Sequence, residues 1–182
     1  QVIDRETLAT SGKITVADAL RAISANTGNA TNETSNSGWA SGSAGIGVGM
    51  EGAAAAKGAK PVARIVAHAA HAQEPSAFTT APVGAIQKLL AKAGWTIADV
   101  DLFEINEAFA CVAMFAMRDL GIPHEKVNVN GGACALGHPI GASGARIIVT
   151  LLHALQARGK KKGLATLCIG GGEATAMAIE LV

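Results

Sequence analysis

The sequence predicts a layered α/β domain, in which helices cover a single sheet. Apolar runs of strand length alternate with stretches of helical spacing after Pro61, as a layered domain requires. Hydrophobic residues make up 49% of the 182 residues, which is enough to fill one core. Aromatic residues make up only 3%, whereas glycine occurs 22 times, and this composition favours close packing of helices on a sheet.

The change in composition near Pro61 predicts two regions, a loop- and edge-rich segment at residues 1–60 and a domain at residues 61–182. Between residues 26 and 49, Asn, Thr, Ser and Gly dominate, and such a stretch cannot bury enough apolar surface to fold alone. The chain starts with Gln1 rather than with an initiator methionine or a signal peptide. We therefore expect it to begin within a longer protein.

Five apolar runs are expected to form the strands of one sheet. They lie at residues 62–70, 100–105, 127–130, 163–169 and 174–181. Their lengths are typical of strands, and residues 170–172, three successive glycines, separate the last two runs.

Three stretches have helical spacing of their apolar residues, at residues 82–93, 107–120 and 142–157. Pro82 stands in the first turn of the first helix, and Gly94 supplies its stop. The second helix is mostly apolar and is followed by Gly121, so it should be nearly engulfed. The third has a broad apolar face and ends in Arg158 and Gly159, a cation followed by a left-handed cap.

The charge distribution argues against nucleic-acid and membrane partners. The net charge is +1, and the one basic run, residues 160–162, is expected to solvate a helix end rather than to bind phosphate groups. No apolar run reaches the roughly 20 residues that a membrane helix needs.

The three cysteines, Cys111, Cys134 and Cys168, are an odd number without Cys-x-x-Cys spacing. They indicate neither a disulfide framework nor a zinc site, so we expect no metal and a reducing compartment. Cys134 stands four residues before His138 and could suggest a nucleophile pair, while Cys111 lies on an apolar helix. For both, a structural role is the preferred interpretation.

Asn106 is the first residue of the sequence Asn-Glu-Ala-Phe, residues 106–109, which lies where a predicted strand ends and a predicted helix begins. Polar side chains at such a point emerge at the carboxyl edge of the sheet, where site residues cluster. Taken alone, Asn106 is also a typical helix cap.

His138 stands in a glycine-dense loop, residues 130–144, that leads into the third helix. The loop has neither the Gly-x-Gly-x-x-Gly nor the Gly-Lys-Ser/Thr pattern, which argues against a phosphate cradle. Gly137 and Pro139 flank His138 and make its position stiff. The pattern leaves a structural and a catalytic histidine equally open.

Cys168 ends a predicted strand immediately before the three glycines, so its thiol is expected at the sheet edge beside bare backbone N–H groups. Such groups can stabilise an oxyanion. A buried structural cysteine is the alternative.

These three segments, in this order, resemble the carboxy-terminal signatures of the thiolase family. Residues 106–109 resemble its Asn-Glu-Ala-Phe motif, residues 130–144 its glycine-rich Gly-His-Pro loop, and residues 168–172 its Cys-x-Gly-Gly-Gly motif. The resemblance runs from Pro61 to Val182 and is greatest to the biosynthetic, acetoacetyl-coenzyme A type. It implies a thiolase-type half in which a mixed five-stranded sheet is covered by helices.

The resemblance implies an acyltransferase that forms or cleaves short-chain 3-oxoacyl-coenzyme A, such as acetoacetyl-coenzyme A, through a cysteine acyl-enzyme. The acyl-carrying cysteine is expected outside this chain, which would be inactive by itself. His138 resembles the histidine that activates that cysteine, and Asn106 the side chain that holds the water of an oxyanion hole. Cys168 resembles the second cysteine, which exchanges a proton with the substrate α-carbon and needs a pKa near neutrality. Gly170 would lend its N–H to a second oxyanion hole.

The resemblance also implies the substrate contacts and the partners. Phe109, Ala108 and Phe78 resemble residues that line the acyl and pantetheine pocket, and the bulk of Phe78 favours short acyl groups. No cofactor is expected, because coenzyme A is a substrate. The expected partners are acyl-coenzyme A, coenzyme A, an amino-terminal thiolase half in the same or another chain, and further copies in a homo-oligomer. The expected compartment is the cytoplasm, with mitochondrion and peroxisome left open.

Two other function classes were considered. A half-thiolase that binds acyl-coenzyme A or lipid without turnover remains open, because the acyl-carrying cysteine is expected elsewhere. A dinucleotide-binding oxidoreductase shares the α/β pattern, but the phosphate fingerprint is missing from the sequence.

Overall fold

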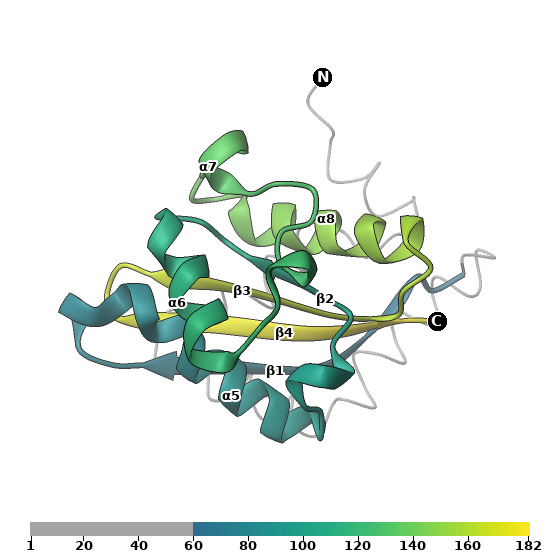
Figure 1. Ribbon diagram of the computed structural model, residues 1–182, viewed down its shortest axis with the longest axis horizontal. Helices are drawn as coiled ribbons and strands as arrows, with labels where there is room; N and C mark the ends of the chain where they lie inside the picture. The colour runs from purple at the N-terminus through teal and green to yellow at the C-terminus, as the bar shows by residue number, and fades with distance from the viewer. Residues whose placement is uncertain (1–59) are drawn as a thin grey trace, which may run out of the picture. The chain divides into compact units, whose positions relative to one another are not determined.

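The computed structural model describes residues 60–182, which form a mixed four-stranded sheet (Figure 1). The strand order is β1-β4-β3-β2; β4 runs antiparallel to β1 and to β3, and β2 runs parallel to β3. The strands are β1 (Ala63–Ala72), β2 (Leu102–Ile105), β3 (Lys162–Ile169) and β4 (Glu173–Leu181). The predicted α/β class and mixed sheet are confirmed, whereas the segment predicted at residues 1–60 lies, apart from residue 60, outside the described part.

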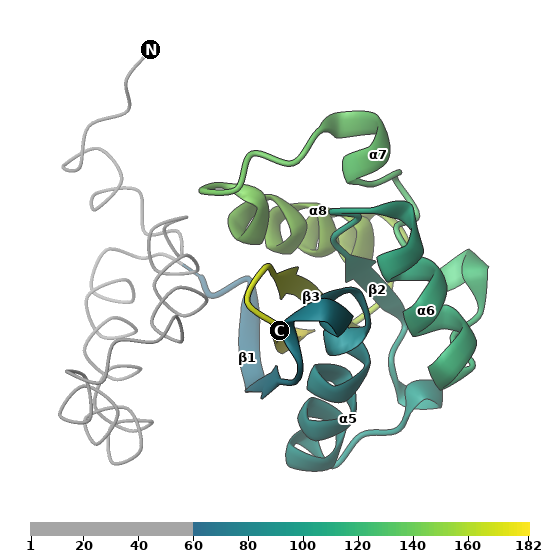
Figure 2. The ribbon, with the colours of Figure 1, turned by 90° about the vertical axis from the view of Figure 1, so that its left-hand side faces the viewer.

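Helices cover both faces of the sheet, with α8 on one side and α5 and α6 on the other (Figure 2). The longer helices are α5 (Ala81–Ala93), α6 (Ala110–Leu120) and α8 (Ser143–Ala157). The shorter ones are η2 (Pro75–Thr80), η3 (Ile97–Asp99), η4 (His124–Lys126) and α7 (Ala133–Leu136). No helix in residues 60–182 is long and apolar enough to cross a membrane.

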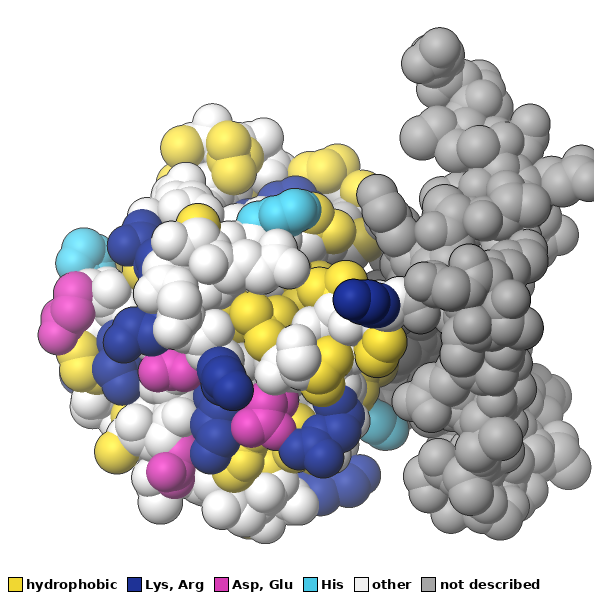
Figure 3. Space-filling model, turned by 90° about the vertical axis from the view of Figure 1, so that its right-hand side faces the viewer, with side chains coloured by type: hydrophobic (Ala, Val, Ile, Leu, Met, Phe, Trp, Pro, Cys, Tyr) yellow, Lys and Arg dark blue, Asp and Glu magenta, His cyan; other side chains and the backbone are white. Residues whose placement is uncertain are grey.

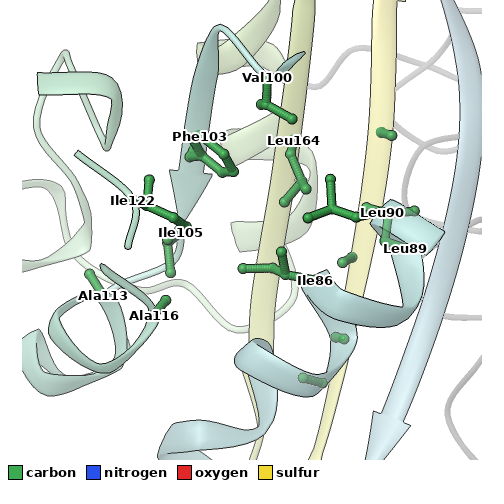
Figure 4. Packing of buried hydrophobic residues seen from close by; sticks show 14 of the residues in the cluster. Ile86, Leu89, Leu90, Val100, Phe103, Ile105, Ala113, Ala116, Ile122 and Leu164 are labelled. Atoms are coloured by element: carbon green, nitrogen blue, oxygen red, sulfur yellow. The ribbon is translucent and has the colours of Figure 1, made fainter. Parts of the chain in front are cut away.

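The layer between the sheet and helices α5 and α6 contains the larger hydrophobic cluster (Figure 4). Ile86 and Leu89 of α5 and Phe103 of β2 are completely buried in it. Each such side chain stabilises the fold by about 1.5–3 kcal/mol relative to an exposed position. On the same face β4 presents only small side chains, so α5 can lie close to the sheet; these are Ala174, Ala176 and Ala178.

The layer on the opposite face is formed by α8, whose Ile147, Leu151 and Leu155 are completely buried. A Cβ atom on Gly163 of β3 would lie 2.9 Å from the Leu151 side chain. The absence of a side chain at Gly163 therefore lets α8 approach the sheet. Because both faces are covered, the central strands β3 and β4 are mostly apolar on both sides, with Thr166 and Thr175 as buried exceptions.

Glycines end two of the predicted helices as expected. The residue after α5 is Gly94, with φ of 67°, and the residue after α6 is Gly121, with φ of 64°. Only glycine adopts this left-handed conformation readily, so both helices stop there. The start of α6 differs from the prediction at residue 107, because Phe109 is extended, with φ of −140° and ψ of 148°, and the helix begins at Ala110.

The predicted fifth strand at residues 127–130 is wrong. Val127 makes one isolated parallel bridge to Phe103, and Asn128 then turns the chain with φ of 47°. The Asn128 side chain takes the place of a strand: its Oδ1 accepts from the Ile105 N–H at 2.8 Å, and its Nδ2 donates to the Ile105 carbonyl at 2.9 Å. Asn tolerates the left-handed region, so it can form a turn within a stretch that otherwise looks like a strand. The apolar residues at 127–130 alone therefore did not reveal the turn.

Candidate active site

Asn106 directly follows β2 and is completely buried. Its backbone N–H donates to the Thr166 carbonyl of β3 at 2.9 Å, which extends the contact between the two parallel strands by one residue. Parallel strands end at the same edge of a sheet, and Cys168 follows Thr166 by two residues. The strand ends therefore bring the first and third sequence motifs to one edge.

The side chains of Asn106 and His138 meet, although 32 residues separate them. The Asn106 Nδ2 lies 3.4 Å from Nδ1 and 3.5 Å from Nε2 of the imidazole, so the amide nitrogen is close to both ring nitrogens. His138 is half-buried in the loop between α7 and α8. The glycine-rich loop thus folds over the carboxyl end of β2.

Ser143, the first residue of α8, also contacts the His138 ring. Its Oγ lies 2.5 Å from the His138 Nδ1 and donates its hydrogen to the Pro139 carbonyl at 3.1 Å. Because a hydroxyl has one hydrogen, Ser143 accepts from Nδ1–H, and this network assigns the proton of the neutral imidazole to Nδ1. Nε2 then carries the lone pair that can act as a base, and the Asn106 Nδ2 lies 3.5 Å from it. No sequence motif singled out Ser143, although it stands five residues after His138 at the start of a predicted helix.

Glu107 fastens the glycine-rich loop to the end of the sheet. Its two carboxylate oxygens accept from the Cys134 backbone N–H at 3.0 Å and from the Asn128 Nδ2 at 2.6 Å. A Cβ atom on Gly132 would lie 2.4 Å from this carboxyl group, so a side chain there would displace the carboxylate from its hydrogen bonds. Partial burial raises the pKa of Glu107, but hydrogen bonds from Cys134 and Asn128 outweigh it and hold that pKa below its ordinary value.

Cys134 is exposed, and Cys111 is half-buried on α6. Desolvation and the neighbouring Glu107 carboxylate raise the pKa of the Cys134 thiol. This environment disfavours a thiolate, which a nucleophile requires. It agrees with the structural role predicted for Cys134.

Cys168 is buried near the end of β3 and packs in the cluster beside α5 and α6. The pKa of its thiol lies above the ordinary value, mainly because the thiol is buried. A backbone hydrogen bond lowers this pKa, and the nearby Cys111 raises it, but burial has the largest effect. The near-neutral pKa that the resemblance implies for Cys168 therefore stays a prediction for the complete site. Within residues 60–182, no hydrogen bond joins the Cys168 thiol to Asn106 or His138, so the convergence of all three side chains stays a prediction.

Gly170 is exposed in the turn between β3 and β4, and a Cβ atom there would meet nothing within 4 Å. Its backbone is therefore open to approach by a ligand. Gly172 in the same turn has φ of 94°, and a Cβ atom on it would lie 2.3 Å from the Gln73 carbonyl oxygen. The turn thus combines an open backbone position with one where a side chain is excluded.

The three predicted pocket residues lie together near the start of α6. The Phe78 and Phe109 rings meet edge to face, with centroids 5.9 Å apart and an interplanar angle of 69°. Phe78 and Ala108 are partly buried against the core cluster, whereas 57% of Phe109 is exposed. An apolar surface from η2 and from the residues before α6 is thereby available to a ligand. No group of three metal-binding side chains occurs in the part of the chain that the structure describes.

The fold and the site together define a three-layered α/β domain with a polar site at the carboxyl ends of its parallel strands. The chain belongs to the thiolase family, because the model for "Thiolase, C-terminal domain" matches residues 59–181.

Its relatives include full-length enzymes that the chain matches in part. It is 56% identical over 144 residues to the acetyl-CoA acetyltransferase of Allochromatium vinosum, and equally to that of Escherichia coli K12; each match covers 79% of this chain. The chain covers about a third of these relatives, 36% in both cases. Among solved structures, the acetyl-CoA acetyltransferase of Bacillus anthracis is similar with a TM-score of 0.70 and 47% identity, over 72% of this chain and 34% of that one.

Proposed function

We propose that the protein carrying this chain is a thiolase that forms or cleaves short-chain 3-oxoacyl-coenzyme A, such as acetoacetyl-coenzyme A, through a cysteine acyl-enzyme. This chain would supply His138, Asn106 and Cys168, and an amino-terminal half would supply the acyl-carrying cysteine. The observation that carries the proposal is the contact between Asn106 and His138 at the sheet edge, inside a region 56% identical to acetyl-CoA acetyltransferases.

In the first half-reaction, His138 acts as the general base. Its Nε2 lone pair accepts the thiol proton of the acyl-carrying cysteine, and the sulfur attacks the thioester carbonyl of the acyl donor. The bond from that carbonyl to the coenzyme A sulfur then breaks, and the departing thiolate takes the proton from the His138 imidazolium. Ser143 supports this role because it keeps the Nδ1 proton engaged. The Asn106 Nδ2 is a hydrogen-bond donor beside the ring and stabilises negative charge directly or through a water.

In the half-reaction that makes or breaks the carbon–carbon bond, Cys168 exchanges a proton with the α-carbon of the acetyl unit. In condensation that carbon bonds to the acyl carbonyl as the bond from the carbonyl to the acyl-carrying sulfur breaks, and cleavage is the reverse. In the cleavage direction the Cys168 thiol protonates the departing enolate, and the raised pKa keeps the thiol in the required form. In the condensation direction its thiolate removes the α-proton, so the completed site must lower that pKa. The Gly170 N–H would stabilise the thioester oxygen while the enolate exists.

Phe78, Ala108 and Phe109 would form the wall for the acyl and pantetheine groups. The edge-to-face contact of the two rings places a bulky side chain beside that wall, which favours short acyl groups. Coenzyme A would be a substrate, with no separate cofactor. We further propose that the working protein is a homo-oligomer in the cytoplasm.

The test is single-turnover acylation measured beside condensation, in the protein that combines this chain with its amino-terminal half. We expect Cys168→Ala to retain acylation and to abolish condensation, because the two cysteines serve different half-reactions. His138→Ala should impair both, and Cys134→Ala is the matched control that should impair neither. If the unaltered protein binds acyl-coenzyme A but is never acylated, the proposal fails in favour of a non-catalytic acyl-coenzyme A or lipid-binding module.

A further inference from the structure

The edge strand β2 carries one charged side chain, Glu104, among apolar ones. Glu104 is 1% exposed, and its Oε2 accepts from the Arg146 Nη1 of α8 at 3.3 Å. Its second oxygen, Oε1, is buried without a hydrogen-bond partner within residues 60–182. Replacing such a pair by apolar side chains is often neutral or stabilising, so stability alone does not account for it.

The same guanidinium also reaches the candidate active site. The Arg146 Nη2 lies 3.4 Å from the Asn106 Oδ1, while Nη1 faces Glu104. A guanidinium is planar and presents its N–H groups in a rigid fork, so one arginine can bind a carboxylate and an amide oxygen at once. Arg146 therefore links a buried carboxylate to the amide that contacts His138.

This link decides which end of the Asn106 amide faces the site. With Oδ1 on the guanidinium, the NH₂ group must point the other way, and Nδ2 lies 3.4–3.5 Å from the His138 ring nitrogens. A rotated amide would set its NH₂ against the N–H groups of Arg146, which is a contact between two donors. Only one of the two amide orientations is compatible with Arg146.

We propose that Arg146, held by Glu104, is a positioning residue that fixes the Asn106 amide with its donor toward His138. Neither Arg146 nor Glu104 touches reacting atoms in this proposal. The consequence for catalysis rests on the proposed thiolase function, whereas the orientation of the amide does not.

The substitution Arg146→Lys separates charge from geometry. The lysine ammonium keeps a positive charge beside Glu104, but it lacks the planar fork that spans Glu104 and Asn106. The matched control is Arg118→Lys on α6, where the arginine forms an exposed pair with Asp119 at 2.6 Å.

The direct measurement is NMR of the Asn106 side-chain amide in this 182-residue chain. We expect Arg146→Lys to shift both amide proton resonances and to speed their exchange with water, and Arg118→Lys to leave them unchanged. If Arg146→Lys does not fold, the double variant Glu104→Gln/Arg146→Met removes both buried charges together and is expected to give the same change. An Asn106 amide unaltered in a folded variant would overturn the proposal.

The second measurement is steady-state kinetics of the protein that combines this chain with its amino-terminal half. We expect Arg146→Lys to lower kcat by about 10- to 100-fold, as for other partners that orient catalytic groups, with little change in KM. An unchanged kcat, or a loss confined to KM, would count against positioning of a catalytic donor. If the unaltered protein has no thiolase activity, the proposed function fails, and the NMR result still decides the orientation.

Discussion

At the scale of single residues, Glu104 is a buried group whose protonation should affect stability. Burial raises its pKa to about 7; the Arg146 guanidinium opposes this shift and the Glu107 carboxylate adds to it. Between its ordinary value of 4.5 and about 7, the folded chain keeps the proton that the unfolded chain has lost. The free energy of unfolding must therefore fall as pH rises through this range.

We predict that wild type loses up to about 3 kcal/mol of stability between about pH 5 and about pH 8 relative to Glu104→Gln. Glutamine keeps the side-chain length but cannot ionise, so this part of the pH dependence should vanish. Urea unfolding of both proteins across the range measures the difference. Parallel pH profiles would show that Glu104 titrates at its ordinary value.

Ser143 provides a second prediction at this scale. Ser143→Ala removes the acceptor for the His138 Nδ1–H, so the ring can rotate and change tautomer. We expect kcat of the assembled protein to fall by roughly tenfold or more, with a stability cost of about 1 kcal/mol. The control is Thr150→Ala on the same helix, which should leave kcat unchanged. Equal kcat in both variants would mean that another group holds the ring.

At the scale of elements, the turn between β3 and β4 depends on one glycine. Gly172→Ala would combine a φ of 94° with a Cβ 2.3 Å from the Gln73 carbonyl oxygen, and we expect a loss of about 1–3 kcal/mol or more. Gly170→Ala, two residues earlier, meets open space and should cost less than about 1 kcal/mol. Thermal unfolding of the two variants gives the comparison, and equal losses would contradict it.

Sequence patterns predicted the elements that are defined by local chemistry. Gly94 and Gly121 end helices because their left-handed conformation is a local property, and the α8 helix was visible in its apolar face. The fifth strand was wrong because the Asn128 side chain, rather than a backbone segment, pairs with Ile105. Such a replacement depends on residues 23 positions apart and leaves no periodic signal.

For the candidate site, too, the sequence predicted the residues that stand in local motifs but not those that come together only in the fold. Asn106 and His138 stood out because each occupies a distinctive motif, and they do meet. Glu104 and Arg146 did not stand out in the sequence. Glu104 lies within an apolar strand, Arg146 lies on a helix, and 42 residues separate them. Their link to Asn106 exists only once α8 has packed on the sheet.

At the scale of the whole molecule, apolar side chains remain at the surface of the described residues. The face in Figure 3 shows hydrophobic side chains between charged ones. Ile140 in the His138 loop is 85% exposed, and Leu136 and Met114 are also largely exposed. Surfaces of this kind often mark protein contacts.

We predict that the isolated chain self-associates, as expected for a thiolase half that packs against a homologous half and a second subunit. Sedimentation over a dilution series at micromolar concentration should show species larger than a monomer. Single monodisperse monomers throughout would contradict the prediction.

The Asn128 side chain also decides where this sheet can be extended. On the outer side of β2, the Phe103 carbonyl accepts from the Asn128 N–H at 2.9 Å, and both backbone groups of Ile105 are bound by the Asn128 amide. A further strand would find these positions taken. Within residues 60–182, β1 pairs only with β4, so its outer edge is where backbone from elsewhere could add by strand pairing. Among the described residues, the Asn128 side chain closes the β2 edge of the sheet, whereas no described strand pairs with the outer edge of β1.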